Sequence, residues 1–417
     1  MRHKIVIVGA LVIVSLMIRS ARAETEVEVS GQVRVRSEID KKRFDPLAAS
    51  LAFTDMRTRV AVEAIRDGNA HVFVQFQDSR RWGGQTADGK DASGGLENGR
   101  NVDVHQAFVQ LDRAGLDRFG IKIGRFEFNL GNQRVFGSVG WHNVGRVWEG
   151  GQAWYDGDRL NLTGFWLKRR ELNDTLSNRD YDVVGAQLAF KEQGVELFGV
   201  YEYNADRLTA VGDDVRVNAL DRISIGLHAR RQFGRGDFEC NAVYQTGNQR
   251  NDLSPDDYDI AAFLITGELG ITINADRNSR LALAVDLASG DDNPADDKIK
   301  AYDNLYYTGH KFRGYMDYFL GSGPRGLVDV IVRGRTSLSP TWTAQADVHY
   351  FTTAQNYAVA DGDSKAVGVE IDAGVATTAV KGVTLVWGGS IFLPSEDYAG
   401  ADQDPGLWVY SMLTMDF

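Results

Sequence analysis

Apolar and polar residues alternate with a period of two along most of the chain from Glu24 onward. In residues 27–36 the valines lie at odd positions among polar residues, and residues 119–124, 222–228 and 281–288 repeat this pattern. A period of two is that of a β-strand with one apolar face, and the 3.6-residue period of helices is almost absent. The pattern therefore predicts an all-β fold.

Turn signals divide the chain into about eighteen strands of about 8 to 14 residues each. The expected strands are 26–37, 54–66, 70–79, 101–112, 118–127, 149–156, 159–170, 181–191, 194–204, 221–233, 237–247, 259–270, 279–290, 326–338, 341–353, 365–378, 382–392 and 407–417.

The connections between these strands alternate in length. Short ones lie at 67–69, 113–117, 157–158, 192–193, 234–236 and 339–340, and long ones at 38–53, 80–100, 128–148, 171–180, 205–220, 248–258, 291–325 and 393–406. Short periplasmic turns and long extracellular loops are the plan of a transmembrane antiparallel β-barrel. The competing architecture is a secreted β-solenoid or propeller, which requires a fixed repeat that this sequence lacks.

The strand length fits a membrane, because a tilted strand needs about 9–11 residues to cross the hydrocarbon, and every backbone group must be paired there. On 341–353 the expected outward set runs from Trp342 through Val348 to Tyr350, with an aromatic residue toward each membrane interface. The inward set of that strand is polar and includes Asp347 and His349.

Both ends of the chain carry export signals. Arg2 and Lys4 precede an apolar run over 5–18, and Ala21-Arg22-Ala23 offers a cleavage site, so we expect a signal peptide at 1–23 and a barrel at 24–417. An uncleaved anchor is the alternative. The terminal Phe417, after apolar residues at alternate positions, resembles the signal read by the barrel-assembly machinery. These features predict the bacterial outer membrane, with its lipid and lipopolysaccharide as partners.

Charge excludes one class of partner. Removal of residues 1–23 leaves 42 basic against 57 acidic side chains, a formal net charge of −15. So acidic a chain is a poor candidate for binding nucleic acid, and none is expected. The lone Cys240 cannot form an internal disulfide and is interpreted as a small filler on a strand.

The first expected hairpin concentrates basic residues. Arg34 and Arg36 end one strand, Arg57 and Arg59 begin the next, and residues 41–43 add three more cations between them. Like charges that face each other across a strand pair are destabilising unless an anion lies between them. Two interpretations stay open: a substrate carboxylate held by arginine, or internal pairing with the acidic residues Glu38, Asp40, Asp55 and Glu63.

Over the strands whose phase is clear, the inward charges are mixed, and they do not by themselves predict an anion channel. The inward basic residues are Arg34, Arg36, Arg57, Arg59, Lys122, Arg222, Arg230, Arg333 and Arg335, and the inward acidic ones are Glu26, Glu28, Glu63, Asp286, Asp329, Asp347, Glu370 and Asp372.

The connection 291–325 is too long for a simple loop in a compact fold. Its acidic start, 291–297, is either a binder of divalent cations in the lipopolysaccharide layer or a solvated tip. Its second half is aromatic and basic and contains His310, Lys311 and Arg313, which suits inward folding to narrow the pore.

Three stretches together resemble the alginate-export family of outer-membrane barrel porins. They are Gly124-Arg125 through Asn129-Leu130-Gly131 to Arg134, Trp141-His142-Asn143-Val144-Gly145-Arg146-Val147-Trp148-Glu149-Gly150, and Thr308-Gly309-His310-Lys311-Phe312 to Gly314-Tyr315-Met316-Asp317. The resemblance implies a monomeric 18-stranded barrel whose arginine-rich lumen passes anionic polysaccharide such as alginate. It also implies that Arg125, Arg134 and Arg146 contact the solute in the lumen.

Catalysis is not expected, because neither a His-Glu-x-x-His helix nor a Gly-x-Ser-x-Gly elbow is present, and the histidines are scattered singly. No cofactor or metal is expected either. The sequence thus predicts a passive outer-membrane channel for anionic oligo- or polysaccharide or related small anions. A general, weakly selective porin for small solutes is the alternative.

Overall fold

The structure is a computed structural model that describes residues 24–83, 85–86, 102–171, 180–204, 219–250, 257–401 and 403–417. The expected signal peptide at 1–23 lies outside these ranges, as do segments of the longer loops. None of the helices in the described ranges is long and apolar enough to span a membrane.

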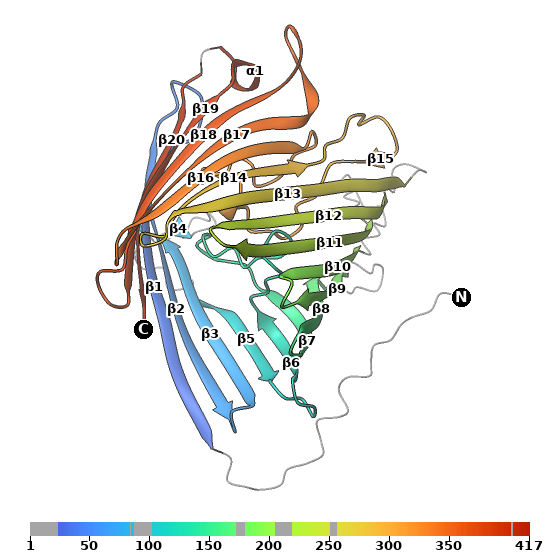
Figure 1. Ribbon diagram of the computed structural model, residues 1–417, viewed down its shortest axis with the longest axis vertical. Coiled ribbons are helices and arrows are strands. Elements are labelled where there is room, and N and C mark those ends of the chain that lie inside the picture. The colour runs from blue at the N-terminus through green and yellow to red at the C-terminus, as the bar shows by residue number, and fades with distance from the viewer. Residues whose placement is uncertain are drawn as a thin grey trace.

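Eighteen long strands form one closed antiparallel barrel, as the sequence predicts (Figure 1). They are β1 (Thr25–Lys41), β2 (Leu51–Arg66), β3 (Ala70–Arg81), β5 (Val102–Leu111), β6 (Phe119–Phe126), β7 (Trp148–Asp156), β8 (Leu160–Arg170), β9 (Tyr181–Phe190), β10 (Val195–Asn204), β11 (Ala219–Phe233), β12 (Gly236–Arg250), β13 (Tyr258–Asn274), β14 (Ser279–Ala288), β16 (Leu327–Ser339), β17 (Trp342–Val359), β18 (Gly362–Thr377), β19 (Val383–Pro394) and β20 (Gly406–Asp416).

The described ranges also contain four short elements. The two-residue strands β4 (Gln85–Thr86) and β15 (Lys298–Ile299) pair with β3 and β13, and the helices are η2 (Gly309–Lys311) and α1 (Glu396–Ala399). The main difference from the expected strand ends is at β17, which runs six residues past 353 to Val359. Figure 1 shows the resulting β17–β18 hairpin projecting at the end of the barrel that carries α1.

The barrel closes between its first and last strands. Strands β1 and β20 pair from Gln32 with Asp416 to Lys41 with Leu407, and the backbone of Phe417 exchanges two hydrogen bonds with Gly31. Closure leaves no free edge between these strands, as a hydrocarbon environment requires.

The outer face is apolar, and the alternation predicted for β17 is confirmed. Val348 and Tyr350 are exposed on the outside, and His349 between them is fully buried. Trp342 stacks on Trp387 at 6.1 Å, near the short turns. Aromatic rings at the ends of an apolar band mark the interfaces of such barrels with the membrane.

The inside of the barrel differs from the expected polar lining. Two connections fold into the lumen: inner loop 1 (residues 127–147) between β6 and β7, and inner loop 2 (residues 289–326) between β14 and β16. Apolar side chains of the loops and of the surrounding wall pack into two clusters inside the barrel. One joins Phe128 and Phe136 of inner loop 1 to Tyr306 of inner loop 2, and the other surrounds Met316 and Phe319.

Burial of this apolar surface stabilises the loops by about 25 cal/mol per Å². It also explains why Phe165 and Leu167 of β8 face inward although they are apolar. Part of the lumen is therefore filled with protein instead of water.

Candidate functional site in the barrel lumen

The basic hairpin predicted from the sequence faces the lumen beneath inner loop 1. Arg34 of β1 and Arg57 of β2 lie directly opposite each other and are almost completely buried. Arg34 donates to the carbonyl oxygens of Gly140 at 2.7 Å and His142 at 3.2 Å, and Arg57 donates to the same two atoms at 3.2 Å each. Neither guanidinium forms an ion pair with a carboxylate of the described residues.

The other two arginines of the hairpin are neutralised. Arg36 pairs with Glu38 at 2.6 Å, and Arg59 pairs with Glu127 of inner loop 1 at 3.0 Å. Internal pairing is thus confirmed for Arg36, whose partner is one of the four acids expected. Among the others, Asp40 pairs with Lys42 at 3.7 Å, whereas Asp55 pairs with Arg81 and Glu63 with His71.

Trp141 connects the hairpin to both inner loops. The guanidinium of Arg36 lies 4.1 Å from the centre of its indole ring, and the imidazole of His310 stacks on the ring at 4.2 Å. Asp317 bonds the same imidazole at 3.0 Å. Both faces of the indole are therefore covered, so Trp141 positions the loops and offers no face to a sugar.

Arg146 and Arg169 form a second cationic pair on the extracellular side. Arg146 donates to the carbonyl oxygens of Tyr306 and Tyr307, the latter at 3.2 Å, and Arg169 lies 5.1 Å over the ring of Tyr306. Burial and the neighbouring charge of Arg169 lower the pKa of Arg146 below its usual value. Arg169 was missed in the sequence because Phe165 and Leu167, which share its face of the strand, are apolar, so the residue pattern did not show that this face points inward.

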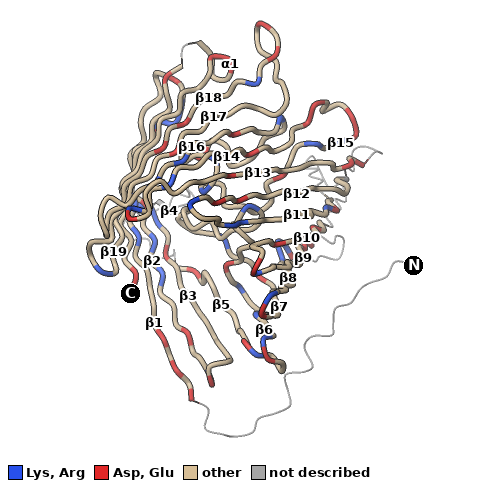
Figure 2. The backbone as a smooth tube through the Cα atoms, in the orientation of Figure 1, with Lys and Arg blue, Asp and Glu red and all other residues tan. Residues whose placement is uncertain are grey.

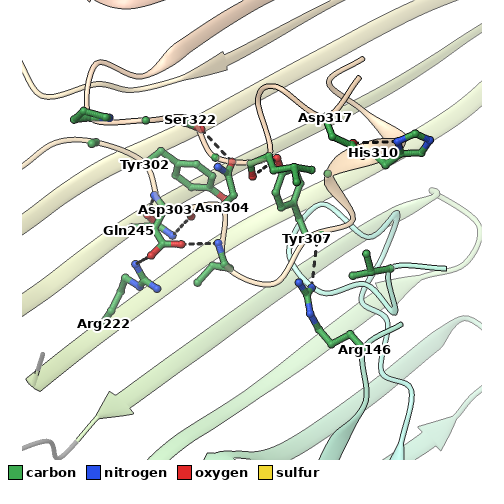
Figure 3. A pocket seen from close by; sticks show the side chains of 18 of the residues that line it. Arg146, Arg222, Gln245, Tyr302, Asp303, Asn304, Tyr307, His310, Asp317 and Ser322 are labelled. Atoms are coloured by element: carbon green, nitrogen blue, oxygen red, sulfur yellow. Dashed lines mark hydrogen bonds and ion pairs between the residues drawn. The ribbon is translucent and has the colours of Figure 1, made fainter. Parts of the chain in front are cut away.

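A cavity of about 770 Å³ lies above the inner loops, on the extracellular side. Figure 3 shows Arg146 reaching it from inner loop 1, and Tyr307 and His310 from inner loop 2. On the opposite wall Arg222 is held by Glu202 at 2.7 Å and Asp303 at 2.8 Å. The cavity is thus bordered by cations, aromatic rings and amides, with some of its charges already paired.

Arg134 anchors inner loop 1 to the barrel wall. Its guanidinium makes two bonds to the carboxylate of Asp286 on β14, one of them at 2.9 Å, and lies 3.7 Å from the ring centre of Phe312. Both charged groups are buried. The structure therefore gives Arg134 a structural partner that is 152 residues away in the sequence.

Four other predicted residues lie in two further places inside the barrel. Lys311, Arg333 and Arg335 line the periplasmic half of the lumen. Arg313 is buried inside inner loop 2, where it donates to Ser322 at 2.9 Å, and solute cannot reach it.

Arg125 does not face the lumen. Lys122 and Phe126 point inward from β6, so the odd-numbered residues, including the exposed Ile123, point outward. Arg125 pairs with Glu149 at 2.9 Å on that outer face. The strand alternation, which is local, overrides the placement that the family resemblance implied.

Two groups of inner loop 1 have perturbed acidity. Partial burial and the charges of Arg36 and Arg34 lower the pKa of His142. Burial opposes ionisation of Glu127, but the hydrogen bond from His105 and the charge of Arg59 prevail and lower its pKa. The loop thus favours a neutral imidazole and an ionised carboxylate.

Figure 2 shows Asp and Glu at the loop ends near α1 and beside β15. In the part of the chain that the structure describes, no group of three or more His, Cys, Asp or Glu side chains is arranged to hold a metal ion.

The profile of the alginate export family matches residues 25–369. Similar solved structures include Pseudomonas aeruginosa OccK8 (OprE), with 13% identity and a TM-score of 0.62, and a BenF-like porin from Pseudomonas fluorescens Pf-5, with 12% and 0.59. Pseudomonas aeruginosa OpdK with vanillate has 11% identity and a TM-score of 0.58. Each alignment covers 94% of this chain and 98% of the other. Such low identities show the fold alone. No curated protein matches the sequence.

Proposed function

Because the chain belongs to the alginate export family and forms a closed porin-like barrel, we propose that it passes anionic solutes through the outer membrane passively. The proposed substrates are anionic oligo- or polysaccharides of the alginate type. The family and the fold are those of channels, and we infer that the chain has no catalytic role.

The observation that carries this proposal is the pair Arg34 and Arg57. Their charges lie opposite each other in a low-dielectric wall and are met only by neutral hydrogen-bond acceptors. Carbonyl dipoles satisfy the donors but leave the net charge in place, so the potential in the adjacent lumen stays positive. A positive constriction favours anions over cations.

A general porin for small solutes is the second candidate. The many ion pairs inside the lumen favour it, and so does the similarity to OpdK, whose structure contains vanillate, a small aromatic carboxylate. A cavity of about 770 Å³ also fits a small ligand.

Single-channel recording in planar bilayers under a KCl gradient tests the proposal. We expect a reversal potential on the anion-selective side, and current block by a mannuronate oligomer but not by a neutral maltooligosaccharide of equal length. If the channel prefers anions and is blocked by vanillate but not by the mannuronate oligomer, its substrates are small anions and not oligosaccharides. A weakly selective current that neither oligomer blocks would refute the proposal in favour of the general porin.

A further inference from the structure

The first strand of the barrel continues past the end of the last one. Strand β1 pairs with β2 from Thr25 onward, but with β20 only from Gln32 onward. Figure 1 shows this start of β1 extending beyond the C-terminus. It lies beside the short turn between β2 and β3, and short turns mark the periplasmic end of such a barrel. Residues 25–30 therefore have no neighbour among the described strands on one side, which we call the β1 edge.

The backbone groups along the β1 edge lack partners in the described ranges. Gly31 directs its N–H and carbonyl groups toward β20, where both bond to Phe417. Backbone groups alternate in direction along an antiparallel strand, so every second residue before Gly31 directs its groups the same way. These residues are Thr25, Val27 and Val29, and none of their groups at this edge bonds to a described residue. Such a row of unpaired groups is a template for another strand.

The outer face of the β1 edge is apolar. The side chains of Val27 and Val29 are 61% and 63% exposed. Val29 lies opposite Val62 of β2, and the ring of Phe417 lies against Gly31. A strand added at the β1 edge would continue this face if its own outward residues were apolar, because neighbouring side chains on one face of a sheet pack together.

The inner face of the β1 edge is acidic. Glu26 and Glu28 are exposed and form no ion pair with any residue that the structure describes. Glu28 lies directly opposite Glu63, whose carboxylate bonds to His71 at 2.8 Å. Like charges that face each other across a strand pair are destabilising, and a lysine or arginine beside them would relieve the repulsion. The same carboxylates would repel an acidic strand, so they select the charge of a partner.

A second copy of the chain does not fit the β1 edge. Antiparallel pairing of two such edges would place one copy upside down in the membrane. Parallel pairing about a twofold axis along the strands would set Val27 and Val29 of one copy on the same face as the glutamates of the other. The occupant must therefore be a different polypeptide segment that enters from the periplasm.

We propose that the β1 edge binds an extended segment of a periplasmic protein, which adds a strand in line with β20. Main-chain hydrogen bonds to Thr25, Val27 and Val29 provide the binding, and the side-chain pattern provides the specificity. The segment carries apolar residues on its outward side and lysine or arginine on its inward side, opposite Glu26 and Glu28. The channel would thus hold a periplasmic partner at its rim, whichever solute it passes.

The test uses a short peptide of alternating valine and lysine as the probe, with a valine–glutamate peptide of equal length for comparison. Binding to the full chain in nanodiscs of zwitterionic lipid is measured by fluorescence anisotropy. We expect the lysine peptide to bind and the glutamate peptide not to bind. Hydrogen–deuterium exchange at the amides of Thr25, Val27 and Val29 should be fast in the free protein and slow with the lysine peptide, because the added strand protects them.

Two variants separate the main chain from the charges. V27P/V29P removes two N–H groups that point to the free edge and none that bonds to β2, so the barrel should stay closed while binding weakens at least about tenfold. E26Q/E28Q should weaken binding about fivefold, as expected for two exposed ion pairs. E192Q is the matched control and should bind like the wild type, because Glu192 lies in the short turn between β9 and β10 and pairs with Arg159.

Four results would overturn the proposal. Undiminished binding by V27P/V29P would place the peptide elsewhere, and equal binding of the two peptides would refute a basic partner. Slow exchange of the three amides in the free protein would show that the chain itself covers the edge. Disulfide-linked dimers of V27C, absent from the wild type with its lone Cys240, would assign the edge to a second copy.

Discussion

Arg34 and Arg57 face each other across the β1–β2 pair, and both donate to the carbonyl oxygen of Gly140. One backbone oxygen thus bridges two guanidinium groups that would otherwise repel each other. The arrangement fixes inner loop 1 to the wall and keeps two positive charges beside the pore.

Neutralisation of this pair is expected to change both selectivity and loop order. In R34Q/R57Q the lumen loses two buried cations, so the reversal potential should shift toward cations, and the loop should fluctuate more because Gly140 and His142 lose charged donors. The measurement is the reversal potential and open-channel noise in a KCl gradient. R159Q is the control, because Arg159 lies in the short turn between β7 and β8, where its exposed side chain pairs with Glu192, and it should match the wild type. An unchanged reversal potential in R34Q/R57Q would contradict the assignment.

Loss of one partner of the Arg134–Asp286 pair should destabilise the barrel. R134Q leaves the carboxylate of Asp286 buried and unpaired, which costs about 3–5 kcal/mol. The double variant R134M/D286L removes both charges and should recover most of that loss. Urea unfolding in lipid vesicles, followed by tryptophan fluorescence, gives the free energies. If the single and double variants were equally unstable, packing and not the ion pair would hold the loop.

Trp141 should hold the two inner loops together. W141A removes the contacts with Arg36 and His310, so we expect larger conductance fluctuations and a loss of stability smaller than the about 3–5 kcal/mol of a fully buried tryptophan, because Trp141 is partly buried. W141F keeps an aromatic face between the two groups and should lie closer to the wild type. Quiet channels in W141A would show that the loops are held without this ring.

Acidification should loosen inner loop 1 through His142. The N–H of Val144 donates to Nδ1 of His142 at 3.2 Å, and protonation of Nδ1 removes this acceptor and adds a cation near Arg36. Because the pKa of His142 is lowered in the folded protein, its contribution to stability is present above the usual value of about 6.5. It is lost as the pH falls from that value through the lowered pKa.

The check is channel noise between about pH 7.5 and 5, a range that brackets the usual histidine pKa. H142N keeps an acceptor near the position of Nδ1 but does not titrate, so its noise should vary less with pH. Equal pH dependence in the wild type and in H142N would assign the effect to another group.

The alternation of residues determined the barrel, because lipid and lumen select opposite faces of each strand and that selection is local. Trp342, Val348 and Tyr350 could be placed outside from the sequence alone, and the same phase would have placed Arg125 outside.

The tertiary structure alone decided which lumen charges are free. Arg134 and Asp286 meet across 152 residues, and the carbonyl oxygens that hold Arg34 come from a loop more than 100 residues away. Where a loop enters the lumen, apolar residues such as Phe165 face inward. In these strands the alternation no longer shows which face points to the lumen. Strand patterns arise from the medium on each side, whereas the pairing of charges depends on the path of the inner loops through the barrel.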